Sequence, residues 1–188
     1  KDDLMDAVSQ MYGASEVVRN SKHLVEAGFD GDLDELKSWI DKGFHIESSD
    51  GRKYTALSEA ACQGQMEVIK YLIENGANPN AVSDTGRSPL WRASFNGHGE
   101  AVAYLLEAGS DPDLPDTVSM EVALDVAKDQ ATRDLLTAWP RGRTEQLIEA
   151  RKKAMIAALE QRIKTSAERE AYAKQQLRLE VVSKAEAG

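Results

Sequence analysis

A glycine-rich turn at residues 95–101, FNGHGEA, places a histidine directly between two glycines. This histidine is the first candidate for chemistry, because imidazole binds metal ions and titrates near neutral pH. The other histidines, His23 and His45, stand far from His98 in the chain and lack the ligand spacing of a zinc site. We therefore expect neither a metal site nor a cofactor.

An acidic stretch at residues 30–41, DGDLDELKSWID, has aspartates at alternating positions and a twelfth-position aspartate, as in a calcium loop. Glu35 occupies the position where that loop needs glycine, and Lys37 occupies its apolar eighth position. The pattern agrees better with a helix start, where acidic side chains are favoured by the helix dipole. We therefore do not predict calcium binding.

Cys62 is the one cysteine of the chain, which excludes an intramolecular disulfide and favours a reducing cytoplasm. No base accompanies it in the sequence. The chain also lacks a phosphate-binding glycine loop, a nucleophile elbow and paired carboxylates in an apolar setting. The sequence thus predicts a protein that is not an enzyme.

Charge divides the chain into two parts. Up to Pro140 there are 12 basic and 25 acidic residues, whereas Arg141–Gly188 carries 11 basic and 7 acidic residues. The formal net charge of −9 argues against nucleic acid as the main ligand. No apolar run approaches the roughly 20 residues of a membrane span, and the first residues show no signal-peptide pattern. Because the chain does not start with methionine, we expect a segment of a longer protein.

The sequence repeats itself with a period of 33 residues, since residues 55–80 and 88–113 align without a gap. The same offset places a further unit near Leu24, and ALDVA at 123–127 begins a last unit that is shorter by four residues. Apolar positions within a unit fit two short antiparallel helices, with Gly64 in the turn between them and Thr55 and Ser88 as hydroxyl caps. Each helix pair is too small to be stable alone and must stack on its neighbours.

Two stretches carry a family resemblance: SDTGRSPLWRASFNGHGEAVAYLLEAGSDPD and YTALSEAACQGQMEVIKYLIENGANPN resemble the ankyrin repeat. The resemblance implies an all-α solenoid of three to four helix-turn-helix units over residues 21–139, and a role in binding other proteins. Trp91 and Ser58 replace the histidine of the family motif, and Lys53 stands where the next unit has Gly86. The combination of DGRKYTALSEAACQG with TGRSPLWRASFNGH is also similar to proteins that join ankyrin repeats to IQ motifs, although this chain contains no IQ motif.

Both flanks of the repeats differ from them in composition. Residues 1–20 are expected to form a helical cap or linker, and residues 140–143, PRGR, a break. Residues 144–188 are rich in Ala, Glu, Lys, Arg, Gln and Leu and predict a long, projecting, charged helix. Its narrow apolar stripe is expected to meet another chain, as in a coiled coil. The stripe residues proposed for partner binding are Met155, Leu159 and Ile163.

Residues at equal positions in successive repeats should line a concave wall. One row contains Phe29, Cys62 and Phe95, and polar rows run beside it. An aromatic ring framed by polar groups is typical of an interface hot spot. The predicted partner-binding residues of the repeats are Tyr54, Glu59, Arg87, Trp91, Arg92, Phe95 and Asn96. For Trp91 the alternative is burial between repeats.

These features predict a non-enzymatic scaffold or adaptor whose repeats bind one protein and whose C-terminal helix anchors in a larger assembly, with the cytoskeleton or cilium as candidates. An alternative rests on residues 150–164, ARKKAMIAALEQRIK, which are basic and amphipathic like a calmodulin target. The same helix also has the charge to lie on an acidic microtubule surface. A cytoplasmic location is expected in either case.

Overall fold

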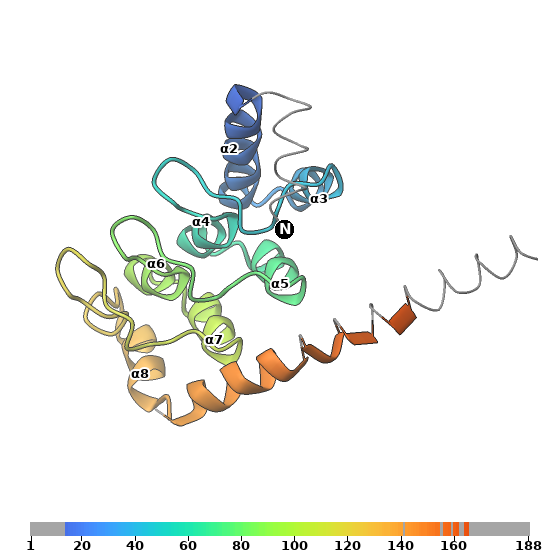
Figure 1. Cartoon of the computed structure of the whole chain (residues 1–188). Coiled ribbons are helices and arrows are strands. Elements are labelled where there is room, and N and C mark those ends of the chain that lie inside the picture. The colour runs from blue at the N-terminus through green and yellow to red at the C-terminus, as the bar shows by residue number, and fades with distance from the viewer. Residues whose placement is uncertain (1–13, 141, 155, 159, 162–163, 166–188) are drawn as a thin grey trace, which may run out of the picture. The chain divides into compact units, whose positions relative to one another are not determined.

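The computed structural model describes residues 14–140, 142–154, 156–158, 160–161 and 164–165. The expected all-α class is confirmed over these residues, which contain no strand and only an isolated bridge between Ser49 and Thr55. The helices are α2 (Ala14–Asp30), α3 (Leu33–Asp41), α4 (Ala56–Gln63), α5 (Met66–Glu74), α6 (Pro89–Asn96), α7 (Gly99–Glu107) and α8 (Gln130–Ala138) (Figure 1).

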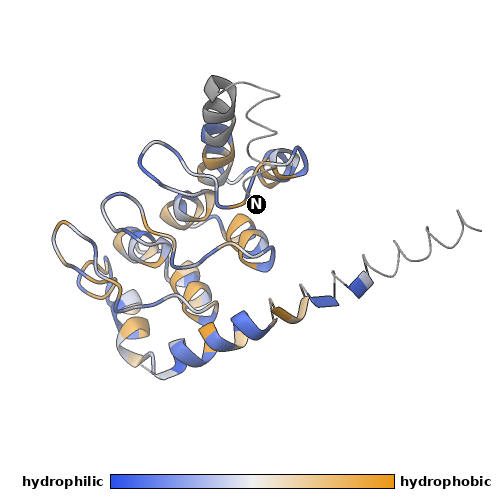
Figure 2. Cartoon of the chain, viewed as in Figure 1, coloured by the Kyte–Doolittle hydropathy of each residue, from blue (hydrophilic) through white to orange (hydrophobic). Residues whose placement is uncertain are grey.

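Consecutive helices form pairs, and the pairs stack side by side (Figure 1). The first helices of the pairs, α2, α4 and α6, make one row, and α3, α5 and α7 make a second row. Each helix is hydrophobic on part of its surface only (Figure 2). The apolar sides bury leucines such as Leu57, Leu72, Leu90 and Leu105 in one continuous core. Each fully buried leucine contributes roughly 1.5–3 kcal/mol to stability.

Close approach of the first-row helices needs a small residue. A Cβ atom on Gly28 would lie 2.5 Å from the carbonyl oxygen of Ala56, which is too near for any side chain. The helix starts agree with the predicted caps, because Thr55 accepts a hydrogen bond from the Ser58 N–H and Ser88 from the Trp91 N–H. Gly64 ends α4 with a φ of 71°, as its predicted turn requires.

The acidic stretch at residues 30–41 is confirmed as a helix start. Asp32 caps α3 by accepting a hydrogen bond from the Glu35 N–H at 2.9 Å, and Asp34 and Glu35 occupy the first turn. No group of three or more His, Cys, Asp and Glu side chains in the described part of the chain is arranged to hold a metal ion.

The last unit differs from the others. Residues 123–126 form a turn where the repeat pattern would place a helix, although Ala123 and Ala127 are still buried. The four-residue deletion explains the difference, because the chain must reach the start of α8 without a complete first helix. Asp129 caps α8 through the Thr132 N–H, and this backbone hydrogen bond lowers the pKa of Asp129 against the opposing effect of desolvation.

Hairpin loops connect each pair to the next and lie beside one another (Figure 1). The Asp84 N–H donates to the Arg52 carbonyl oxygen, and the Thr117 N–H donates to the Thr85 carbonyl oxygen. The equivalent tip residues Lys53, Gly86 and Met120 all have left-handed backbones, with φ values of 62°, 77° and 59°. Lys53 therefore adopts the conformation of the glycine that it replaces, which costs a non-glycine residue about 1–2 kcal/mol.

The start of the last helix contacts the repeats. The described residues between 142 and 165 are helical. Arg143 forms an ion pair with Glu107 at 2.7 Å, and the indole N–H of Trp139 donates to the Thr144 hydroxyl at 2.9 Å. The chain separates into two compact units, Lys1–Ile148 and Glu149–Gly188.

Some expectations lie outside the described residues. They concern residues 1–13, the stripe residues Met155, Leu159 and Ile163, and the continuation of the last helix beyond residue 165. Among the helices that the structure describes, none is long and apolar enough to cross a membrane.

Backbone strain at Lys53 gives a stability prediction. Lys53→Gly removes the left-handed penalty and should raise the free energy of unfolding by about 1 kcal/mol, measured by urea denaturation. Gly86→Ala is the converse change, because a Cβ atom there would lie 2.6 Å from the Thr117 nitrogen. It should lower the free energy by at least about 1 kcal/mol. A loss of stability in Lys53→Gly would contradict the strain at this hairpin.

Candidate functional site

Polar contacts that repeat with the period join the starts of α5 and α7 to the first-row helix of the preceding repeat. The His98 imidazole contacts the Cys62 carbonyl oxygen at 3.0 Å, and one repeat earlier the Gln65 amide donates to the Phe29 carbonyl oxygen at 3.3 Å. Each bond satisfies a carbonyl oxygen in the last turn of a first-row helix. No backbone N–H of the same helix is available to donate to an oxygen at that place. His98 therefore connects neighbouring repeats, in addition to starting α7.

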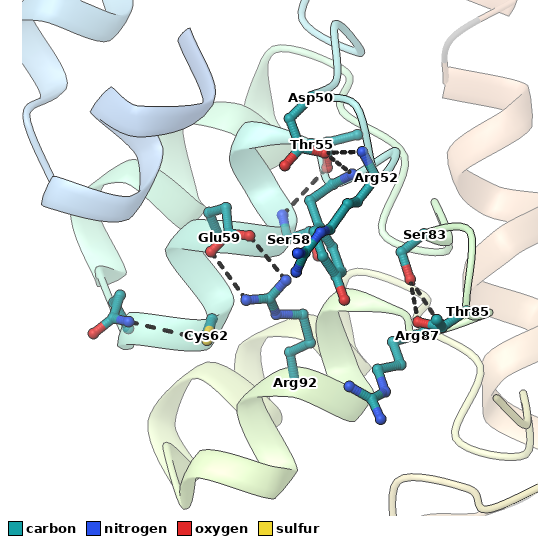
Figure 3. Close-up of polar contacts among 12 residues, drawn as sticks. Asp50, Arg52, Thr55, Ser58, Glu59, Cys62, Ser83, Thr85, Arg87 and Arg92 are labelled. Carbon is teal, nitrogen blue, oxygen red and sulfur yellow. Dashed lines mark hydrogen bonds and ion pairs between the residues drawn. The ribbon is translucent and has the colours of Figure 1, made fainter. Parts of the chain in front are cut away.

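A largely buried ion pair joins α4 to α6. The Arg92 guanidinium donates two hydrogen bonds to the Glu59 carboxylate, at 2.9 and 3.0 Å, and both side chains are 13% exposed (Figure 3). The same guanidinium lies 4.1 Å from the centre of the Tyr54 ring. Burial alone would lower the pKa of Arg92, but a hydrogen bond with Cys62 and the charge of Glu59 raise it. Two predicted contact residues are thus engaged with each other.

Three stacked groups lie beside this ion pair. The rings of Trp91 and Phe95 are nearly parallel, with centroids 5.2 Å apart, and the Arg87 guanidinium lies 4.5 Å from the centre of the Trp91 ring. Trp91 is only 4% exposed, which agrees with the alternative of burial between repeats, whereas Phe95 is 54% exposed. Trp91 therefore supports an exposed aromatic ring.

These side chains line one pocket of about 180 Å³. Its residues are Tyr54, Cys62, Arg87, Trp91, Arg92, Phe95 and Asn96. The structure brings together six of the seven repeat residues that the sequence singled out, while Glu59 lies behind Arg92 as its ion-pair partner. Cys62 was not one of the predicted partner-binding residues. Its membership follows from its place in the same row as Phe95, and its sulfur accepts a hydrogen bond from the Asn96 amide at 3.3 Å.

The third hairpin borders this region through Asp116. Its carboxylate is buried and lies 3.9 Å from the Arg87 Nε. Desolvation by itself would raise the pKa of Asp116, but hydrogen bonds from the hydroxyl and N–H of Ser119 lower it. The hairpin tip exposes Val118 and Met120, which sequence analysis did not single out because they fall outside the repeat motif.

Residues 24–116 match the family model described as ankyrin repeats (3 copies). No curated protein matches the chain. The expected repeat domain, residues 21–139, extends past the match at both ends, and the combination with IQ motifs is not shown. Ankyrin repeats are generally protein–protein interaction modules and are typically non-enzymatic.

The ion pair between α4 and α6 supports a stability prediction. Glu59→Gln leaves the Arg92 guanidinium largely buried without its counter-charge and should lower the free energy of unfolding by about 2 kcal/mol in urea denaturation. Glu26→Gln is the matched control, because Glu26 has the same position one repeat earlier and pairs with Lys22 at a half-exposed site. It should cost less than about 1 kcal/mol. Equal losses in the two variants would show that the pair contributes no more than a surface ion pair.

Proposed function

We propose that the chain is a non-enzymatic adaptor, in which the concave ankyrin face binds one protein and the C-terminal helix anchors in a larger assembly. The observation that carries the proposal is the pocket between α4 and α6, where Phe95 is half exposed on a fixed support. Catalysis is not needed to explain this arrangement, since its polar groups mainly contact one another.

Phe95 has the properties of an interface anchor. Its ring is held by the stack with Trp91, so that binding restricts little additional side-chain motion. Arg87, Arg92 and Asn96 surround it with polar groups, and such aromatic residues within a polar frame account for much of the affinity of protein interfaces. A partner that covers Phe95 would also remove its exposed apolar surface from water.

The anchoring role is supported by the second unit. Lys152, Lys153 and Ile156 are exposed on a helical segment, so both charged and apolar groups are available to another chain. A helix of this composition buries little apolar surface by itself and is therefore weakly stabilised in water without a partner. We infer an assembly in the cytoplasm, with the cytoskeleton or cilium as the candidate sites.

The proposal predicts a loss of affinity in Phe95→Ala. Partners are first identified by crosslinking mass spectrometry in native extract, and the purified partner is then titrated against the whole chain. Truncation of a hot-spot ring costs at least about 2 kcal/mol, so the dissociation constant should rise roughly 30-fold.

Phe29→Ala is the matched control for this measurement. Phe29 occupies the same position two repeats earlier, is 43% exposed and lies outside the pocket lining. Its removal should change the affinity less than about threefold. An unchanged affinity in Phe95→Ala, or an equal loss in Phe29→Ala, would remove the pocket as the centre of the interface.

A second candidate function uses the basic segment at residues 150–164 as a calmodulin or microtubule contact. It is favoured by the exposure of Lys152, Lys153 and Ile156 on one helical segment. A synthetic peptide of residues 144–168 should then bind calcium-loaded calmodulin with a dissociation constant of about 1 μM or lower, measured by calorimetry. Weaker binding would exclude calmodulin. Microtubule co-sedimentation that persists after deletion of residues 141–188 would exclude this segment as the microtubule contact, and a lack of co-sedimentation by the whole chain would exclude microtubules altogether.

A further inference from the structure

The charged side chains that line the pocket differ in sign from most of those in the surrounding repeats. Up to Pro140 the chain carries 12 basic and 25 acidic residues. The pocket lining nevertheless contains two arginines, Arg87 and Arg92, and no carboxylate. Glu59 and Asp116 pair with these arginines from outside the lining, so the charged groups that line the pocket are cationic and favour an anionic group over a cationic one.

The two arginines are not equally available. Arg92 is compensated by its two hydrogen bonds to Glu59. The Nε of Arg87 is buried without a hydrogen-bond partner, and the nearest carboxylate oxygen, on Asp116, is 3.9 Å away. That carboxylate already accepts hydrogen bonds from Ser119. The buried Nε cannot reach an external acceptor, but the side chain is 38% exposed and its Nη atoms form no hydrogen bond with the described residues. These terminal donors are therefore open to an external acceptor.

The orientation of Arg87 is also restricted. Its guanidinium carbon lies 4.5 Å from the centre of the Trp91 ring, and Trp91 stacks on Phe95. A planar guanidinium fixed in this way matches the two oxygens of a carboxylate better than a flexible lysine does. Arg52 adds positive charge, since this exposed side chain extends from the first hairpin toward Arg92 (Figure 3).

We propose that the pocket binds a segment of the partner protein in which an acidic residue stands beside an aromatic one. The carboxylate pairs with Arg87, and the aromatic side chain packs on Phe95. This inference rests on the proposed function of the concave face and adds the chemistry of its partner. It assigns the anion to an aspartate or glutamate of the partner.

The test uses biotinylated synthetic peptide libraries that share random flanks and differ only in a central pair: Glu-Phe, Gln-Phe, Lys-Phe or phosphoserine-Phe. The whole chain is applied to each immobilised library, and the retained amount is measured. Glu-Phe should retain about tenfold more protein than Lys-Phe, with Gln-Phe between them. The ratio should fall as salt rises from roughly 0.15 M to 1 M.

Variants then connect the preference to one side chain. Arg87→Gln should abolish the Glu-Phe preference, whereas Arg87→Lys should retain part of it. Arg143→Gln is the matched control, because Arg143 also stacks on a tryptophan, Trp139, but lies outside the pocket lining. It should leave the preference intact. Thermal unfolding curves establish that each variant is folded, and the comparison of libraries on the unchanged chain needs no variant.

Each outcome has a distinct meaning. Equal retention of Glu-Phe and Lys-Phe, or a preference that survives in Arg87→Gln, overturns the inference. Retention of phosphoserine-Phe without Glu-Phe overturns the assignment to a carboxylate. If Phe95→Ala still weakens the natural partner while peptide charge has no effect, the proposed function stands and only this inference fails. If Phe95→Ala has no effect on that partner, the proposed function itself fails.

Discussion

The packing of α4 against α6 is the contact on which the candidate site depends. Burial of Leu57 and Leu90 holds the two helices together, and only this apolar contact brings Glu59 and Arg92 close enough to pair. The same ion pair between two exposed helices would add little, because water and salt would screen it. The hydrophobic core thus creates the setting in which the polar groups of the pocket have a fixed geometry.

The 33-residue period determines which residues are equivalent in successive repeats, whereas the side chain at each equivalent position determines which contacts it forms. Glu26, Glu59 and Arg92 are equivalent in successive repeats, yet only Glu59 and Arg92 have opposite charges and form an ion pair across neighbouring repeats. The carbonyl bonds from Gln65 and His98 show the converse case, since different side chains make the same connection. A solenoid can therefore keep its stacking while one interface specialises for a partner.

The site residues were predictable in unequal degree. Phe95 could be predicted to be exposed because the repeat register alone indicates the outward direction of its side chain, and it is 54% exposed. Trp91 and Arg92 could be assigned to the same region but not to their roles. Trp91 is buried beneath Arg87, and Arg92 is paired with Glu59. Both contacts depend on residues of a different helix or hairpin. The shortened last unit was visible as a deletion, but its turn at residues 123–126 was not.

Sequence by itself determined the all-α class, the helix pairs, the caps at Thr55 and Ser88 and the turn at Gly64. These features depend on local spacing, because a cap or a turn needs only residues that are neighbours in the chain. The tertiary structure alone decided that Lys53 takes a left-handed backbone and that Arg87 keeps unused donors. The physical reason is that strain and hydrogen-bond satisfaction depend on which groups from distant repeats come within a few ångströms.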